Sequence, residues 1–106
     1  MADDYPTDDD LQRIREWSGD DDRALLAFVK SRWWAADWGW HEYDGVSDGM
    51  RGVHPMRVYL ISTGGWSGNE LLIDALKDSR SFLWWRSWYS HRRGGHYEFR
   101  VEAPRG

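Results

Sequence analysis

The chain has 106 residues, nine of them tryptophan and none cysteine, with 13 acidic and 5 basic side chains in residues 1–50 against 5 and 9 in residues 51–106. This length fits one domain over residues 1–106, and the composition excludes disulfides and thiolate zinc sites, a membrane-spanning helix and an N-terminal secretory signal. Net charges of −8 and +4 in the two halves argue against nucleic acid, which needs a dominant positive surface, but leave room for one local anion site in the second half.

Two helices are predicted near the N-terminus, over residues 8–17 and from residue 20 onward. Thr7 and Asp10 have the spacing of a capping box, in which each side chain bonds the free backbone N–H of the other residue. We interpret the acid clusters as helix starts rather than as an acidic docking patch, because carboxylates suit the positive end of a helix dipole. The apolar face of the second helix has helical spacing: Ala24, Leu25, Phe28, Val29, Arg32 and Trp33.

Residues 35–56 show no clear periodicity. We expect a long irregular connection that its tryptophans hold on the core. Four of its side chains could be drawn into a metal site: His41, Glu42, Asp44 and His54. Their order matches no compact metal-binding motif such as HExxH. We therefore predict neither a metal ion nor a cofactor.

Residues 57–63 alternate as the residues of a strand do. Apolar side chains fall on both faces, which is typical of a central strand. One face has Val58, Leu60 and Ser62, and the other has Tyr59 and Ile61.

A glycine-rich turn follows at residues 64–69, and a helix is expected to begin near Gly68 and to end near Ser79. Ser67 and Glu70 have the spacing of a second capping box. Glycines let the backbone approach a ligand closely, and free N–H groups at a helix start can bind an anion. The turn matches neither the phosphate loop nor the dinucleotide fingerprint, so a tight turn without a ligand stays an alternative.

Residues 82–91 are apolar and aromatic. Their length and aromatic content favour a strand, but so short an apolar run is also compatible with a helix. Residues 96–102 alternate clearly, and Gly94 and Gly95 supply the hairpin turn before them. The side chains expected on the buried face of this last strand are Tyr97, Phe99 and Val101.

Together these elements predict the α+β class. Residues 57–102 form a β-α-β-β unit, and the two N-terminal helices pack on its small mixed sheet. Residues 1–7 are expected to be frayed. The pattern leaves the oligomeric state open, a homodimer included.

The two turns are expected to meet at one edge of the sheet. A helix that runs back along the sheet makes the strands before and after it parallel, so both end at the same edge, where ligands tend to bind in such folds. Arginine forks and helix-start N–H groups suit phosphate or carboxylate, and histidines can exchange protons. The predicted ligand-binding residues are Gly64, Gly65, Trp66, Ser67, Gly68, Asn69, His91, Arg92, Arg93 and His96.

Two blocks resemble small proteins encoded by bacteriophages and prophages: STGGWSGNE at residues 62–70 and RRGGHYEF at residues 92–99. The segments FVKSRWW at 28–34 and DWGWH at 37–41 look similar too, so the resemblance covers roughly residues 11–101. It carries no catalytic residues across. It implies a phage accessory protein in the host bacterial cytoplasm, of a kind that counters host defence by sequestering a nucleotide signal or by blocking a defence protein.

Three functions are weighed. The first is non-catalytic binding of an anionic, phosphorylated or nucleotide-like small molecule at the two turns. The second is a protein-interaction module that inhibits a host bacterial protein through the acidic, tryptophan-rich first half, because exposed aromatic residues anchor interfaces. The third is a small hydrolase with His91 or His96 as base, which we rank lowest because no nucleophile, base and orienting group can be identified together.

Overall fold

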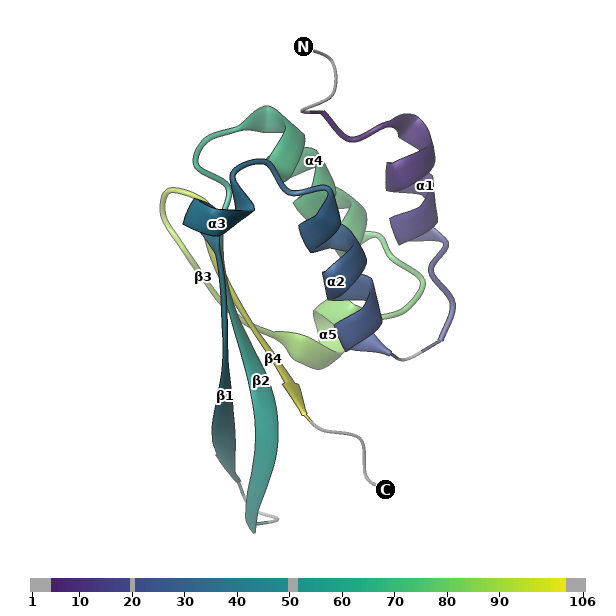
Figure 1. The fold of residues 1–106 in the computed structure, drawn as a ribbon. Helices are drawn as coiled ribbons and strands as arrows, with labels where there is room; N and C mark the ends of the chain where they lie inside the picture. The colour runs from purple at the N-terminus through teal and green to yellow at the C-terminus, as the bar shows by residue number, and fades with distance from the viewer. Residues whose placement is uncertain (1–4, 20, 50–51, 103–106) are drawn as a thin grey trace.

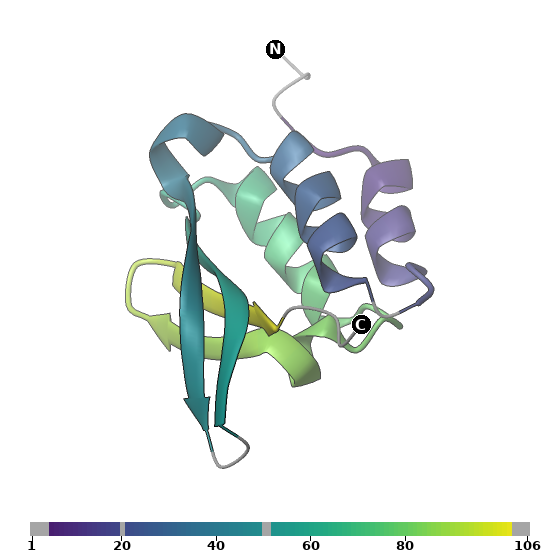
Figure 2. The same ribbon diagram turned by 60° about the horizontal axis from the view of Figure 1, so that its bottom comes forward.

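The computed structural model describes residues 5–19, 21–49 and 52–102, with the side chains of 47–49 and 52–54 left aside. A four-stranded sheet is covered by helices on one face and is open on the other (Figure 1). Figure 2 shows α1, α2 and α4 side by side over the covered face. The elements in chain order are α1 (Asp8–Arg15), α2 (Asp22–Ser31), α3 (Ala36–Gly39), β1 (Trp40–Gly49), β2 (Gly52–Ser62), α4 (Ser67–Lys77), α5 (Leu83–Ser87), β3 (Trp88–Arg92) and β4 (His96–Glu102).

The two N-terminal helices begin as the sequence predicts. The backbone N–H of Thr7 donates to Asp10 Oδ2 at 3.0 Å, and the N–H of Asp10 donates to Thr7 Oγ1 at 3.1 Å, which completes a capping box. Asp21 caps α2 by accepting from the N–H of Ala24 at 3.0 Å. Both acid clusters therefore include residues that satisfy free N–H groups at helix starts.

The α+β class is confirmed, but the sheet is antiparallel rather than mixed. Its strand order is β1-β2-β4-β3, and every neighbouring pair is antiparallel. The strands β2 and β3 do point the same way, because each is antiparallel to β4. They are not neighbours, because β4 returns from the hairpin into the position between them and brings Phe99 and Val101 onto the core.

The segment expected to be irregular contains a strand. The ten residues of β1 pair with β2 from Trp40↔Ile61 to Gly49↔Gly52. The sequence hides this strand because the next two positions on the face of Trp40 are the acids Glu42 and Asp44 rather than apolar residues. Glu42, for example, is held by Trp40 Nε1 at 2.9 Å and by Arg57 Nε at 3.3 Å. The strand β2 also begins five residues before the predicted position.

Two local predictions in the second half need correction. The helix α4 begins at Ser67, so Trp66 is its N-cap residue and Ser67 makes no capping box. The Ser67 hydroxyl instead hydrogen-bonds the Tyr5 hydroxyl at 2.7 Å. Residues 82–91 contain a short helix followed by a strand, because one turn of helix (α5) precedes β3.

Between the helices and the sheet lies one apolar core, to which α1, α2, α4 and α5 and three of the strands contribute. Trp33 and Trp40 pack edge to face there, with ring centroids 5.3 Å apart. Among the described helices, none combines the length and apolar character needed to cross a membrane. The buried apolar residues of the core are Leu11, Ile14, Leu25, Leu26, Val29, Trp33, Trp40, Tyr59, Ile61, Leu72, Ile73, Ala75, Leu76, Leu83, Phe99 and Val101.

Candidate functional site

The strand register builds a row of polar side chains across the open face of the sheet. Ser62 at the end of β2 is opposite His96 at the start of β4, and His96 is opposite Arg92 at the end of β3. Side chains of directly paired residues project from the same face of a sheet. The ends of β2 and β3 therefore do meet at one edge, as the sequence predicts, with β4 between them.

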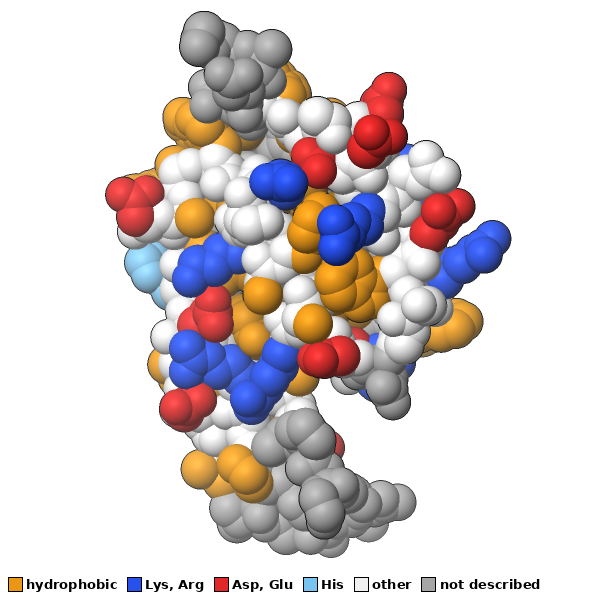
Figure 3. Space-filling model, turned by 45° about the vertical axis from the view of Figure 1, so that its right-hand side comes forward, with side chains coloured by type: hydrophobic (Ala, Val, Ile, Leu, Met, Phe, Trp, Pro, Cys, Tyr) orange, Lys and Arg blue, Asp and Glu red, His pale blue; other side chains and the backbone are white. Residues whose placement is uncertain are grey.

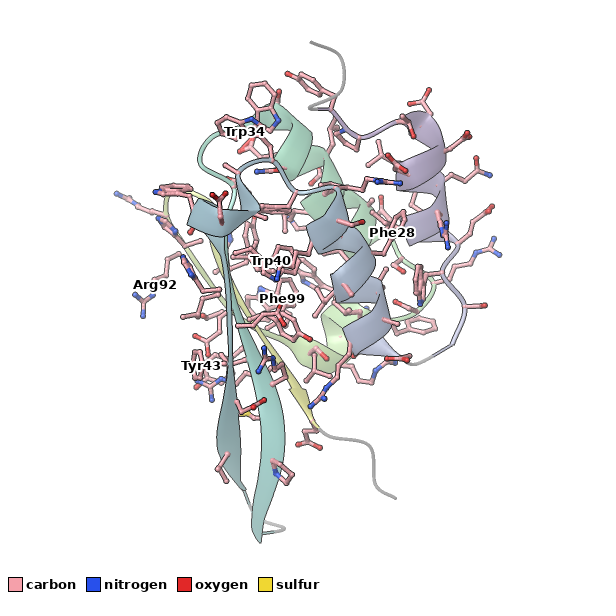
Figure 4. All side chains as sticks on the ribbon, in the orientation of Figure 1. Phe28, Trp34, Trp40, Tyr43, Arg92 and Phe99 are labelled. Carbon is pink, nitrogen blue, oxygen red and sulfur yellow. The ribbon has the colours of Figure 1, made fainter. Side chains whose placement is uncertain are left out.

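A hollow of about 460 Å³ lies over this face. Figure 4 shows Tyr43 and Arg92 projecting from the sheet on the side away from the helices, whereas Trp40 and Phe99 project toward the helices. We call this feature the open-face hollow. Its lining residues are Tyr43, Leu60, Ile61, Ser62, Ser90, Arg92, His96, Tyr97, Glu98 and Arg100.

The open-face hollow has one arginine that is paired with an acid and one that is not paired with any described acid. Arg100 Nε donates to Glu98 Oε2 at 2.6 Å, and the Arg100 guanidinium lies 3.4 Å from the Tyr89 ring centroid. Arg92, by contrast, is exposed and makes no ion pair with any residue that the structure describes. One cation in the hollow is thus available to an outside anion.

His96 is held beside this cation by a short hydrogen bond. Its Nδ1 lies 2.6 Å from Ser62 Oγ, and either atom can be the donor because the His96 tautomer is not fixed. Both side chains reach the open-face hollow. In either neutral tautomer one of the pair can donate to an oxyanion that Arg92 holds: His96 Nε2 when Ser62 donates to Nδ1, or the Ser62 hydroxyl when Nδ1 donates to it.

The edge is closed by direct contact between the two turns. The N–H of Thr63 donates to the carbonyl oxygen of Gly95 at 3.0 Å. Gly94 and Gly95 have φ of 86° and 76°, in the left-handed region that favours glycine. This contact fixes the hairpin, and with it Arg92 and His96, against the end of β2.

The start of α4, which the sequence predicts as part of the anion site, is covered by other side chains. Asn69 is only 1% exposed. It accepts from the N–H of Trp34 at 2.8 Å, and its amide donates to the carbonyl oxygens of Trp34 and Thr63 at 3.1 and 3.3 Å. Gly68 is buried beside the Trp66 indole and Pro6. These two predicted ligand residues are occupied by contacts within the fold.

Trp66 also packs within the protein. Its ring stacks on Trp34 at 4.9 Å and lies 4.9 Å from the Tyr5 ring. The Trp66 Nε1 is buried and has no hydrogen-bond partner among the described residues. These aromatic contacts leave Trp66 as the cover of the first turn of α4 rather than as a free platform for a ligand.

The other five predicted residues, Ser67 among them, are exposed but do not line the open-face hollow. His91 stacks on Tyr97, with ring centroids 4.2 Å apart and planes 6° apart. Gly64 lies under the exposed Trp38 ring, while Gly65 and Arg93 are exposed residues of the two turns. Of the ten predicted residues, Arg92 and His96 are the two that the structure brings together in the hollow.

Sequence reasoning missed several residues of the hollow, above all Ser62, Glu98 and Arg100. Their signal was present in the strand alternation, because Ser62 is in phase with Leu60, and Glu98 and Arg100 are in phase with His96. Tyr43 could not be found in this way, because β1 itself was not recognised.

A second polar cluster, which no motif indicated, lies between α2 and α5. The buried Asp22 carboxylate pairs with the Arg86 guanidinium and accepts from Ser87 Oγ at 2.6 Å. It borders a separate hollow of about 350 Å³. Because the Asp22 carboxylate is bonded to residues of α5, we assign this cluster to holding α5 on α2.

No group of three His, Asp or Glu side chains in the described part of the chain comes together as a metal site. Glu42 and Asp44 instead bind Arg57 at 3.3 and 2.9 Å, and His41 Nε2 lies 2.9 Å from the carbonyl oxygen of Trp38. The side chain of His54 falls outside the described residues.

The charge on the helical side is mixed. Figure 3 shows Lys and Arg side chains interspersed with Asp and Glu on the face turned forward there, so this face offers no dominant positive surface. Comparisons with models of protein families, with curated proteins and with solved structures found no match to this chain.

Proposed function

We propose that the protein binds an anionic, phosphorylated small molecule in the open-face hollow, without catalysis. The observation that carries this proposal is the row of Ser62, His96 and Arg92, in which an arginine without an acidic partner among the described residues stands next to a hydrogen-bonded Ser–His pair that can donate to a ligand. A guanidinium with neighbouring donors is a common solution for binding phosphate or carboxylate.

The residues of the proposed site are supported by the sheet. Each of the three side chains is on a strand residue, and the contact between Thr63 and Gly95 holds the two turns together. Donors that are already in position lose little conformational entropy when a ligand binds. This arrangement supports binding at the hollow rather than at the covered start of α4.

The direct test is a titration of the wild-type protein and two single variants with AMP, followed by NMR. Arg92→Ala is expected to weaken AMP binding by about ten-fold or more, since a charge-assisted hydrogen bond contributes about 1.5–3 kcal/mol. The matched control is Arg93→Ala, which removes the neighbouring exposed arginine of the hairpin turn and is expected to change affinity little. Equal affinities of wild type and Arg92→Ala would reject the site.

A second candidate is the protein-interaction module. It is favoured by one observation: Trp38 is 62% exposed and lies over Gly64, and a large exposed aromatic ring can anchor an interface. Trp33 and Trp40 do not share this role, because both are buried in the core. The test is affinity capture of host proteins with wild type and Trp38→Ala, and capture that does not depend on Trp38 would count against this surface.

The hydrogen bond between Ser62 and His96 has the form of a nucleophile and its base, which favours the hydrolase hypothesis. No described residue, however, makes a hydrogen bond that would orient the other imidazole nitrogen of His96. We therefore propose binding rather than catalysis. A phage origin, action in the bacterial cytoplasm and a role against host defence are further proposals that rest on the resemblance of the two glycine-rich blocks.

A further inference from the structure

The open-face hollow is divided into three chemical zones by the sheet register. The first zone is the row of Ser62, His96 and Arg92 described above, which suits an oxyanion. The second row is Leu60, Glu98 and Ser90, and the third has Arg100 and Tyr43 on either side of the buried Val58. A ligand that fills the hollow must match all three zones.

The charge of the hollow matches one anionic group rather than several. Arg100 is paired with Glu98 at 2.6 Å and lies over the Tyr89 ring, so the charges of Arg100 and Glu98 largely offset each other. Arg92 is the cation left over. A second phosphate in the middle row would face the Glu98 carboxylate, and like charges brought together at a binding site weaken binding.

The middle row instead presents hydrogen-bond acceptors. Ionised Glu98 is an acceptor only, and one of its carboxylate oxygens bonds Arg100. The other oxygen can accept from an N–H or O–H group of a ligand, and the Ser90 hydroxyl can donate or accept. Sugar hydroxyls and exocyclic amino groups have this chemistry.

The part of the hollow over β1 and β2, across the sheet from Arg92, has two partly exposed side chains with apolar surface. Leu60 is 39% exposed and Tyr43 is 48% exposed, and both line the hollow. A planar ring that covers them would remove apolar surface from water and gain contact with the Tyr43 ring.

The spacing of the zones sets the size of the ligand. Leu60 and Arg92 are on strands β2 and β3, with β4 between them, and they belong to adjacent rows of side chains on the open face. Neighbouring strands lie about 4.8 Å apart, and successive side chains on one face of a strand are about 6.8 Å apart. The two backbone positions are therefore about 12 Å apart. A hollow of about 460 Å³ is within the usual range for small ligands.

We infer that the ligand is a nucleoside monophosphate, bound with its phosphate at Arg92 and His96, its sugar or base donors at Glu98, and its ring on Leu60 and Tyr43. This inference rests on the proposed function, because it requires an anion at Arg92. It adds the number of phosphates, the direction in which the ligand lies and the residue that discriminates against longer phosphate chains.

The experiment measures calorimetric affinities of the whole protein for AMP, GMP, ATP, adenosine and inorganic pyrophosphate in one buffer at fixed salt. A monophosphate is expected to bind about ten-fold more tightly than ATP and than adenosine. Glu98→Gln removes the negative charge but keeps an acceptor, so it is expected to raise the affinity for ATP relative to AMP several-fold. Leu60→Ala is expected to weaken AMP and leave pyrophosphate unchanged.

The outcomes separate the two proposals. The first result to consider is that pyrophosphate and ATP bind at least as tightly as AMP, with affinities that fall in Arg92→Ala but do not change in Glu98→Gln or Leu60→Ala. In that case the anion site stands and the monophosphate assignment is overturned. If no phosphate compound binds in a way that depends on Arg92, both proposals are overturned. Heteronuclear NMR spectra confirm that each variant is folded, so that a loss of binding reports on the site.

Discussion

The backbone of Thr63 is bonded to the backbone of Gly95 across the two turns that end β2 and begin β4. The N–H of Thr63 donates to the Gly95 carbonyl oxygen at 3.0 Å, and the Cβ that any other residue would place at position 95 would overlap Thr63 Oγ1. Gly95 also has a φ of 76°. Glycine is thus required at this position both for its backbone conformation and for the close approach of the other turn.

Replacement of Gly95 by alanine is expected to lower stability and weaken ligand binding together, because the hairpin must move away from the end of β2. Gly65→Ala is the matched control. Gly65 has a similar φ of 72° but open space around it, so its variant adds only the backbone strain, about 1 kcal/mol. Urea unfolding and AMP titration of both variants measure the difference.

Thr63→Ala provides the complementary variant, because it removes the hydroxyl that the methyl group of Gly95→Ala would overlap. The double variant Gly95→Ala with Thr63→Ala is therefore expected to be more stable than the sum of the single effects implies. Simple additivity would show that the contact between the turns does not limit position 95.

Asn69 is predicted to be structural rather than ligand-binding. Asn69→Ala leaves the N–H and carbonyl groups of Trp34 without this partner, and a buried polar group left unsatisfied costs about 1–3 kcal/mol. The carbonyl oxygen of Thr63 loses one donor but keeps the N–H of Trp66 at 3.0 Å. Asn69→Asp keeps an acceptor for the Trp34 N–H but loses the donor. Chemical denaturation is expected to rank wild type above both variants, and unchanged stability of Asn69→Ala would contradict the role.

Glu42 is expected to make stability depend on pH. Partial burial acts to raise the pKa of Glu42, but hydrogen bonds from Trp40, Lys30 and Arg57 outweigh it, so the pKa lies below its usual value. A carboxylate with a lowered pKa stabilises the folded state fully above its unfolded pKa, about 4.3, and this contribution is lost as the pH falls through the folded value.

Glu42→Gln is therefore expected to be less stable than wild type at pH 7, with the difference shrinking as the pH falls below about 4. Urea unfolding at a series of pH values measures this difference. Glu16→Gln is the control, because Glu16 is exposed and makes no ion pair within the described part of the chain. A difference for Glu42→Gln that is constant from pH 7 to pH 3 would exclude the linkage.

The Asp22 cluster is expected to stabilise the attachment of α5. Ser87→Ala removes the 2.6 Å hydrogen bond to the buried carboxylate and should cost about 1.5–3 kcal/mol, the usual contribution of a hydrogen bond to a charged group. Thermal unfolding is measured for Ser87→Ala and for the control Ser90→Ala, which removes a hydroxyl on the open face. The difference between the two melting temperatures reports the contribution of the Ser87 hydrogen bond. Equal melting temperatures would mean that the hydroxyl of Ser87 contributes nothing measurable.

Some elements were determined by the sequence alone, because their signals are local. The capping box at Thr7, the cap at Asp21 and the alternation of residues 96–102 each depend on residues within a few positions of one another. For the same reason, the alternation of residues around Leu60 predicted which side chains of β2 share a face. The shared edge of β2 and β3 was predicted in another way, from the helix that runs back along the sheet between them.

Other features were decided only by the tertiary structure. The strand β1 forms because β2 pairs with it and because Lys30 and Arg57 bind the inward acid Glu42, so no local apolar pattern marks it. Asn69 and Arg92 look equally available in the sequence. One is enclosed by the backbone of Trp34 and Thr63 and the other is left on an open face, because distant segments of the chain determine what each side chain meets.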